Sequence, residues 1–355
     1  MFFVLFVIYL DLNSATAYIQ ILFFASFFSW GKKSPCIFKK TGVRCLSRMQ
    51  QQKHKKETEM SFLSQVKKPK PQAPIITLVG FPGTGKTSMA GLFPDPIFIT
   101  AENSQTVFES WPEERQPSFM PQLPHANKAK GIKPSEFLKA QLRELVTEQH
   151  NFKTIIIDTA TSLNDLFEEE VVEYDANPEV QDIGNAAGGY HKGFDVVAGM
   201  HAKVIMMAEC LRQRGMAVVF LAHVGIRKHK NQPDIASEYN TFSLGMHQKS
   251  SALYVKNSDA CLYLKINQFV MGQESDKKGR QTKAGRVTTS GDRVLICSSD
   301  GVMGYVDAKQ RYEMPEEIDV PKGSNPILDY IPFFKTHESR PEKPEVMTET
   351  EAETN

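Results

Sequence analysis

Residues 80–87 read Gly-Phe-Pro-Gly-Thr-Gly-Lys-Thr, and they decide the fold class of this 355-residue chain. They follow an apolar, β-rich run at 75–79, which is typical of a buried strand. They begin a segment from Lys86 to about Phe93 that we expect to be a short helix, because Pro94 and Pro96 would end it. A strand, a glycine-rich loop and a helix in this order, with the full Gly-x-x-x-x-Gly-Lys-Thr spacing, predict a phosphate-binding P-loop.

Each residue type in this loop has a chemical reason. Glycines let the backbone wrap and turn successive N–H groups toward phosphates, and the start of the following helix adds the positive end of its dipole. Lys86 is predicted to reach the β- and γ-phosphates, and the Thr87 hydroxyl is predicted to bind Mg²⁺. We therefore expect ATP, or a close relative, with Mg²⁺ as the cofactors. The residues predicted to contact the nucleotide are Gly80, Phe81, Pro82, Gly83, Thr84, Gly85, Lys86, Thr87 and Ser88.

A carboxylate ends a later strand. The apolar run at 154–157 stops at Asp158 and Thr159. A carboxylate at the tip of the strand next to the P-loop strand can hold Mg²⁺ through water. We therefore predict that Asp158 is the Walker B acid and shares the metal site with Thr87. The alternative is an aspartate that merely ends a buried strand.

Short apolar strands alternate with helices along most of the chain. This alternation predicts an α/β fold with a mainly parallel central sheet covered by helices on both faces. After His223 the pattern changes to a polar, basic stretch and then to strand-like runs, which predict antiparallel strands toward the C-terminal edge. The expected strands are 75–79, 97–100, 154–157, 217–222, 260–270, 284–290 and 293–297; the expected helices are 86–93, 135–149, 159–174 and 194–214; and residues 110–134 and 176–192 are expected to be irregular.

Three parts of the chain differ in composition. Residues 1–59 are apolar and then basic, with the apolar stretch broken at 11–14. A membrane span requires about 20 continuous apolar residues, so we expect an over-extended start ahead of Met60 or Met49, with a membrane anchor in residues 1–30 as the alternative. Residues 60–335 form the predicted nucleotide-binding domain. Residues 336–355 contain six glutamates and are expected to be a disordered acidic tail.

Bulk composition excludes some classes of function. The formal net charge of +1 leaves no global electrostatic signature for nucleic acid or an anionic membrane, so any such surface must be local. The five cysteines form no CxxC pair and do not lie near histidine at metal-ligand spacing. They are expected to be buried or indifferent thiols in a reducing compartment.

Two further residues are assigned by resemblance. The P-loop sequence at 80–87 resembles that of AAA+ ATPases, but these usually carry Asp-Glu at Walker B, where this chain has Asp158-Thr159. The segment 98–102 instead resembles the RecA-like ATPases, which carry their catalytic glutamate at the end of the strand after the P-loop helix. The resemblance puts Glu102 in the position of the general base and His223 in that of a γ-phosphate sensor. The alternatives are a solvated glutamate and a histidine that caps a strand.

The order of motifs over residues 60–335 resembles a group of phage-encoded RecA-like P-loop proteins, some of which are single-strand annealing proteins. The resemblance departs at Gln310, where asparagine is expected. It implies a cytoplasmic ATPase, in the host cytoplasm if phage-encoded, that handles single-stranded DNA in recombination or replication, as a homo-oligomer and with recombination or replication proteins as possible partners. The segments that carry the resemblance are 80–88, 92–94, 96–99, 155–159, 217–223 and 308–315.

The same resemblance places a DNA-binding loop after His223. Basic runs at 227–230 and 247–249 would contact phosphates, and Tyr239, Phe242 and Tyr254 would offer faces for stacking bases. The alternatives are a solvated basic face and core aromatics. Candidates for a cation acting across a subunit interface are Lys249, Lys256 and Lys265. A rival function is a nucleotide-gated switch or assembly factor without DNA contact, tethered to a membrane if residues 1–30 are an anchor.

Overall fold

The computed structural model describes residues 66, 68–229, 238–271, 274–275, 281–283, 286–299 and 305–336. The chain divides into two units, Met1–Pro69 and Lys70–Asn355, and the fold below is that of the second. The predictions for residues 1–59 and for the acidic tail beyond Thr336 lie outside the described residues, as does Lys230 of the basic run.

The second unit alternates strands and helices as expected. In chain order its elements are β1 (Ile75–Gly80), α2 (Lys86–Ala90), β2 (Pro96–Thr100), η2 (Gln105–Phe108), η3 (Glu113–Arg115), β3 (Ser118–Phe119), α3 (Pro134–Thr147), β4 (Thr154–Asp158), α4 (Ala160–Glu173), α5 (Lys192–Gln213), β5 (Ala217–His229), β6 (Tyr239–Leu244), α6 (Gln248–Asn257), β7 (Ala260–Met271), β8 (Glu274–Ser275), β9 (Gln281–Lys283), β10 (Arg286–Ile296), β11 (Lys309–Gln310), β12 (Glu317–Asp319), α7 (Ile327–Tyr330) and α8 (Pro332–Thr336).

The central sheet has the strand order β12-β10-β7-β1-β5-β4-β2-β3. Its middle is parallel: β1 pairs in parallel with β5 and β7, and β4 pairs in parallel with β5 and β2. The antiparallel pairs are β10 with β7 and β12, β11 with β7, and β6 with β5. The predicted fold class is therefore confirmed, and it is that of the P-loop NTPases.

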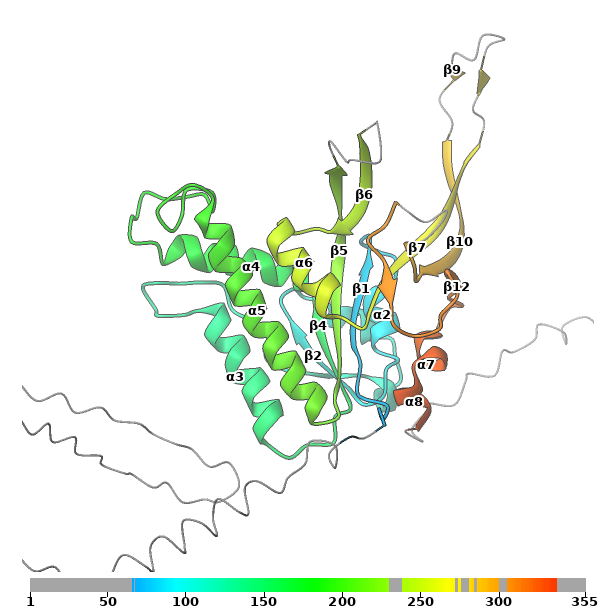
Figure 1. Cartoon of the computed structure of the whole chain (residues 1–355), viewed down its shortest axis with the longest axis horizontal. Helices are drawn as coiled ribbons and strands as arrows, with labels where there is room; N and C mark the ends of the chain where they lie inside the picture. The colour runs from blue at the N-terminus through cyan, green and yellow to red at the C-terminus, as the bar shows by residue number, and fades with distance from the viewer. Residues whose placement is uncertain are drawn as a thin grey trace, which may run out of the picture. The chain divides into compact units, whose positions relative to one another are not determined.

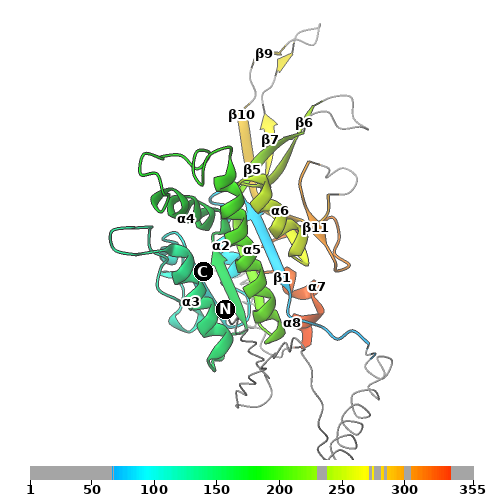
Figure 2. The same cartoon turned by 60° about the vertical axis from the view of Figure 1, so that its left-hand side comes forward.

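Helices cover both faces of the sheet (Figures 1 and 2), and β1 shows why. Successive strand side chains point to opposite faces. Ile75 and Val79 pack in a core with buried residues of α3, α4, α5 and α6. Ile76 and Leu78 pack in a second core with buried residues of α2, α7 and α8. The near-continuous apolar sequence of β1 follows from burial on both sides.

Two β-ribbons extend past the end of β1. Gly80, its last residue, pairs with His223 of β5 and with Leu264 of β7. Both neighbours continue: β5 runs on to His229 paired with β6, and β7 runs on to Met271 paired with β10. Figure 1 shows the two ribbons projecting from the same end of the sheet. The loop that follows Gly80 therefore lies at the base of both ribbons.

Several local predictions were wrong. The strand expected to end at His223 continues to His229, because residues 224–229 pair with β6 instead of forming a loop. Helix α6 was not predicted; it begins at the end of the polar, basic stretch 225–250 and continues to Asn257. The predicted irregular segment 110–134 contains β3, which adds a short parallel edge strand beside β2. The first helix is shorter than expected and has five residues.

The segment 308–315, one of those that carry the resemblance, has a structural role. Arg311 Nη1 lies 2.9 Å from Oδ1 of Asp259, whose other oxygen binds Arg212 and accepts the Ile75 N–H. Asp259 is buried and precedes β7. The segment therefore holds the start of β7 against the start of β1.

Candidate nucleotide site

The P-loop has a backbone that glycine alone adopts easily at two positions. Gly83 has φ 79° and Gly85 has φ 91°, both in the left-handed region that disfavours side chains. The Thr84 hydroxyl donates a 2.8 Å hydrogen bond to the Phe81 carbonyl and closes the loop. The exposed ring of Phe81 packs edge-on against Phe242 of β6, with centroids 5.6 Å apart. The loop thus contacts the β5–β6 ribbon directly.

Lys86 is buried in the middle of the site. Its ammonium donates to the carbonyls of Gly80 at 2.9 Å and Phe81 at 3.0 Å, and lies 3.5 Å from Nδ1 of His223. Burial lowers the pKa of Lys86 to about 8, and the carboxylates of Asp158 and Glu102 oppose this shift. An ammonium poorly compensated by its surroundings is suited to receive an anion.

Thr87 and Asp158 meet as predicted, although by a different route. The Thr87 hydroxyl donates a 3.1 Å hydrogen bond to Oδ2 of Asp158. The prediction that β4 lies next to the P-loop strand was wrong, because β5 lies between β1 and β4. Thr87 nevertheless reaches Asp158, because it belongs to α2, and α2 contacts β5 as well as β1.

Asp158 fits the role of a metal residue. Its side chain is buried, and Oδ1 has no hydrogen-bond partner among the described residues. Burial raises the pKa of this carboxyl, because the charged form is poorly solvated. Mg²⁺ is commonly bound through one or two carboxylates together with substrate phosphates and water. Asp158 and Thr87 would hold Mg²⁺ on the phosphates, and a cation there would favour the ionised carboxylate.

Glu102 and His223 come together although β4 lies between their strands, β2 and β5. Glu102 follows β2, whose last residue Thr100 pairs with Asp158 of β4. Oε1 of Glu102 lies 3.6 Å from Nε2 of His223, and Oε2 accepts a 3.1 Å hydrogen bond from the Ser162 hydroxyl. His223 lowers the pKa of Glu102, and burial opposes this effect. Glu102 is therefore ionised at neutral pH.

The geometry indicates one tautomer for His223. The Lys86 ammonium can only donate, so Nδ1 on that side is the acceptor and Nε2 carries the proton that faces Glu102. The backbone N–H of His223 donates to the Thr161 hydroxyl at 2.9 Å, which fixes the strand at this point. Lys86, His223 and Glu102 thus form a continuous polar row beside the P-loop.

Two supporting residues of the site, Thr161 and Ser162, were not predicted. Both lie in the first turn of α4, and Thr159 caps this helix by accepting the Ser162 N–H. The peptide bond between Asp158 and Thr159 is cis. The run of hydroxyl residues after Asp158 was a visible signal, because such residues are typical of a helix start.

Most residues proposed for DNA or for a subunit interface have partners within the chain. Tyr254 was predicted to be a stacking face, and this is wrong: it is fully buried and bonds His201. Tyr239 stacks on His229 at 4.8 Å. Lys249 pairs with Asp195, and Lys265 lies 3.1 Å from Glu317. Lys256 is exposed.

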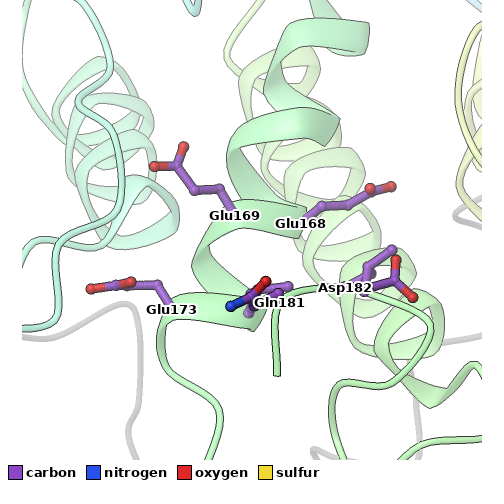
Figure 3. Close-up of a pocket in the computed structure, with 7 residues that line it drawn as sticks. Glu168, Glu169, Glu173, Gln181 and Asp182 are labelled. Atoms are coloured by element: carbon purple, nitrogen blue, oxygen red, sulfur yellow. The ribbon is translucent and has the colours of Figure 1, made fainter. Parts of the chain in front are cut away.

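A separate pocket of about 380 Å³ lies along the second half of α4 (Figure 3). It is acidic and contains none of the P-loop residues. The residues that line it are Glu168, Glu169, Val172, Glu173, Gln181, Asp182 and Ile183. Its carboxylates suit neither phosphates nor an anionic substrate, so it is not part of the nucleotide site.

Two cysteines of the fold are buried and unreactive, as expected. Burial raises the pKa of the thiols of Cys261 and Cys297 to about 12.

Among the described residues, no helix has the length and apolar character needed to cross a membrane.

A glycine loop after a central parallel strand, a buried lysine and a threonine–aspartate pair together define a P-loop nucleotide-binding protein. A family model described as an AAA domain matches residues 72–297. This match covers more than half of the chain, which therefore belongs to this AAA-domain family and carries an ATPase-type domain. A search of curated proteins finds no match.

Proposed function

We propose that this protein is a Mg²⁺-dependent ATPase that acts on single-stranded DNA in recombination or replication. The main support for the proposed ATPase activity is the row formed by Lys86, His223 and Glu102 beside the P-loop. It puts a cation for phosphates and a carboxylate for water in one site, as in-line attack on a terminal phosphate requires.

Each residue of the row has a distinct task. Lys86 neutralises charge on the phosphates, and Thr87 and Asp158 hold Mg²⁺, which supplies electrostatic stabilisation when bound. Glu102 orients the attacking water and accepts its proton. Because its pKa is lowered, Glu102 is a weak base, so orienting the water is the larger part of its contribution. His223 links Glu102 to Lys86 and can transmit a change at either residue to β5.

The DNA part of the proposal is supported by the β5–β6 ribbon. Lys228 and His229 lie on its outer half, where Lys228 pairs with Glu238 and His229 stacks on Tyr239. Strand β5 also carries His223, and Phe242 of β6 contacts Phe81 of the P-loop. The ribbon contacts the P-loop near its base and has basic and aromatic residues farther out. This arrangement suits binding of single-stranded DNA that changes with the bound nucleotide.

The test is ATP hydrolysis by the full chain with and without single-stranded DNA, beside Lys86→Ala and Lys228→Ala. We expect DNA to stimulate turnover, Lys86→Ala to abolish it, and Lys228→Ala to weaken DNA retention at low salt without changing basal turnover. Lys139→Ala, which removes an exposed lysine on α3, is the matched control. Nucleotide binding without DNA stimulation or retention would refute the DNA role and favour a nucleotide-gated switch instead.

The proposal includes assembly into a homo-oligomer. Lys256 is the candidate for a cation reaching a neighbouring copy, because Lys249 and Lys265 are already paired within the chain. Light scattering with and without nucleotide would test assembly, and an ATP-independent monomer at all concentrations would contradict it.

A further inference from the structure

Arg293 lies at the base of the β7–β10 ribbon and contacts the P-loop. A Cβ built on Gly85 would lie 2.5 Å from Nη1 and 3.0 Å from Cζ of Arg293. The guanidinium therefore lies against the backbone of the residue immediately before Lys86. Nothing in the sequence indicated this contact, because about 200 residues separate the two positions.

A register shift in β10 sets the position of Arg293 along β7. Thr289 pairs with Gln268 and Arg293 pairs with Ile266, so residues 290–292 oppose a single residue of β7. Two extra residues leave the alternation of strand faces unchanged, so Arg293 lies on the same face as Thr289 and is shifted by two positions along β7. Leu295, which shares a strand face with Arg293, packs in the core that contains buried residues of α2. The side chain of Arg293 thus extends on the side of the sheet that carries α2.

The guanidinium has no counter-charge within the described part of the chain. The two other half-buried arginines there, Arg212 and Arg227, pair with Asp259 and Asp307 respectively. No hydrogen bond or ion pair among the described residues involves the Arg293 side chain. A half-buried cation that lacks a carboxylate partner, beside a phosphate-binding loop, is suited to an anionic ligand.

We propose that Arg293 is the second cation of the nucleotide site and binds the phosphates at the end nearer the nucleoside. This inference rests on the proposed function. Strand β1 lies between β5 and β7. His223, Asp158 and Glu102 come from the β5 side, whereas Arg293 comes from the β7 side. A phosphate chain whose terminal group lies beside Glu102 extends its other end toward Arg293, and a guanidinium binds phosphate oxygens in pairs.

This position predicts which kinetic parameter changes. ATP and ADP share the phosphates nearer the nucleoside. Arg293→Ala should therefore lower the affinity for both nucleotides by a similar factor, about tenfold for one charge-assisted contact. Turnover at saturating ATP should stay unchanged, because the contact is the same in the ground state and the transition state. Arg143→Ala removes an exposed arginine on α3 and should change neither.

The experiment measures the binding of fluorescently labelled ATP and ADP, and the turnover of ATP, for the full chain and for Arg293→Ala, Arg143→Ala and Lys86→Ala. If Lys86→Ala binds nucleotide like the wild type, the proposed function fails and this inference fails with it. If Lys86→Ala loses binding while Arg293→Ala keeps it, only this inference is overturned. Lost turnover with unchanged affinity overturns it as well, because Arg293 would then act on the transition state.

A second measurement needs no variant. Phenylglyoxal modifies accessible arginines, and mass spectrometry identifies which ones react in the wild-type chain. MgADP should protect Arg293 and leave Arg143 reactive. Equal modification of Arg293 with and without MgADP overturns the inference, even if Arg293→Ala fails to fold.

Discussion

The pKa of Lys86 makes nucleotide affinity depend on pH in a specific window. Burial lowers this pKa to about 8, so the ammonium of the free protein is about 90% protonated at pH 7 and about 10% protonated at pH 9. Only the charged form attracts phosphates strongly. The apparent affinity for ADP should therefore fall about tenfold between pH 7 and pH 9.

Fluorescence anisotropy with labelled ADP at several pH values between 7 and 9 measures this fall. ADP is a suitable probe, because a phosphate pKa of about 6 leaves it about 90% ionised at pH 7 and almost fully ionised at pH 9, so its own titration changes the affinity little. Lys86→Arg is the matched variant: its affinity should be lower in absolute terms, but flat with pH, because arginine stays charged. A flat profile for the wild type, or an equal fall for Lys86→Arg, would refute the reasoning.

Three predictions concern stability. The pKa of Lys86 is lower in the folded protein than in the unfolded chain, so folding stability rises with pH between about 8 and 10.5 and is lowest, at the full cost of the buried charge, below pH 8. Lys86→Met should therefore stabilise the nucleotide-free protein at pH 7 by about 1–3 kcal/mol in urea unfolding. An unchanged free energy of unfolding would contradict this. Burial lowers the pKa of His201 to about 3, so below pH 6.5 the unfolded chain gains a proton that the folded protein does not. Between pH 6.5 and pH 5, His201→Gln should therefore lose about 2 kcal/mol less stability than the wild type. An equal loss of unfolding free energy in the two proteins would contradict this. Asp259→Ala removes the carboxylate that binds Arg212 and the Ile75 N–H and should cost about 3–5 kcal/mol of stability. Arg311→Ala removes only the exposed end of this network and should cost about 1 kcal/mol. Equal losses of the two variants in thermal unfolding would contradict the central role of Asp259.

The sequence predicted those parts of the site that depend on local pattern. The P-loop is contiguous, and Asp158, Glu102 and His223 each follow a recognisable apolar strand. Because parallel strands end at one edge of the sheet, residues at those ends are brought together once the strands are placed. Lys86, Thr87 and these three residues accordingly meet in the structure.

The rest depends on pairing between distant segments. The extension of β5 past His223 requires β6 as a partner, and polar residues 224–229 carry no apolar signal for it. Tyr254 could not be distinguished from a surface aromatic, because the other buried residues of α6 are Ser250 and Ser251, which give no apolar stripe. Arg293 contacts Gly85 from a strand whose register against β7 shifts just before it, and periodicity reveals neither the pairing nor the shift.

The most direct test of the central claim is single-turnover ATP hydrolysis by Glu102→Gln, with nucleotide affinity measured on the same sample. Glu109→Gln, an exposed glutamate after η2, is the control. If Glu102 orients the attacking water, its variant should bind ATP nearly as the wild type does and hydrolyse it at least about 100-fold more slowly, while the control hydrolyses normally. Hydrolysis by Glu102→Gln at the wild-type rate would contradict the account.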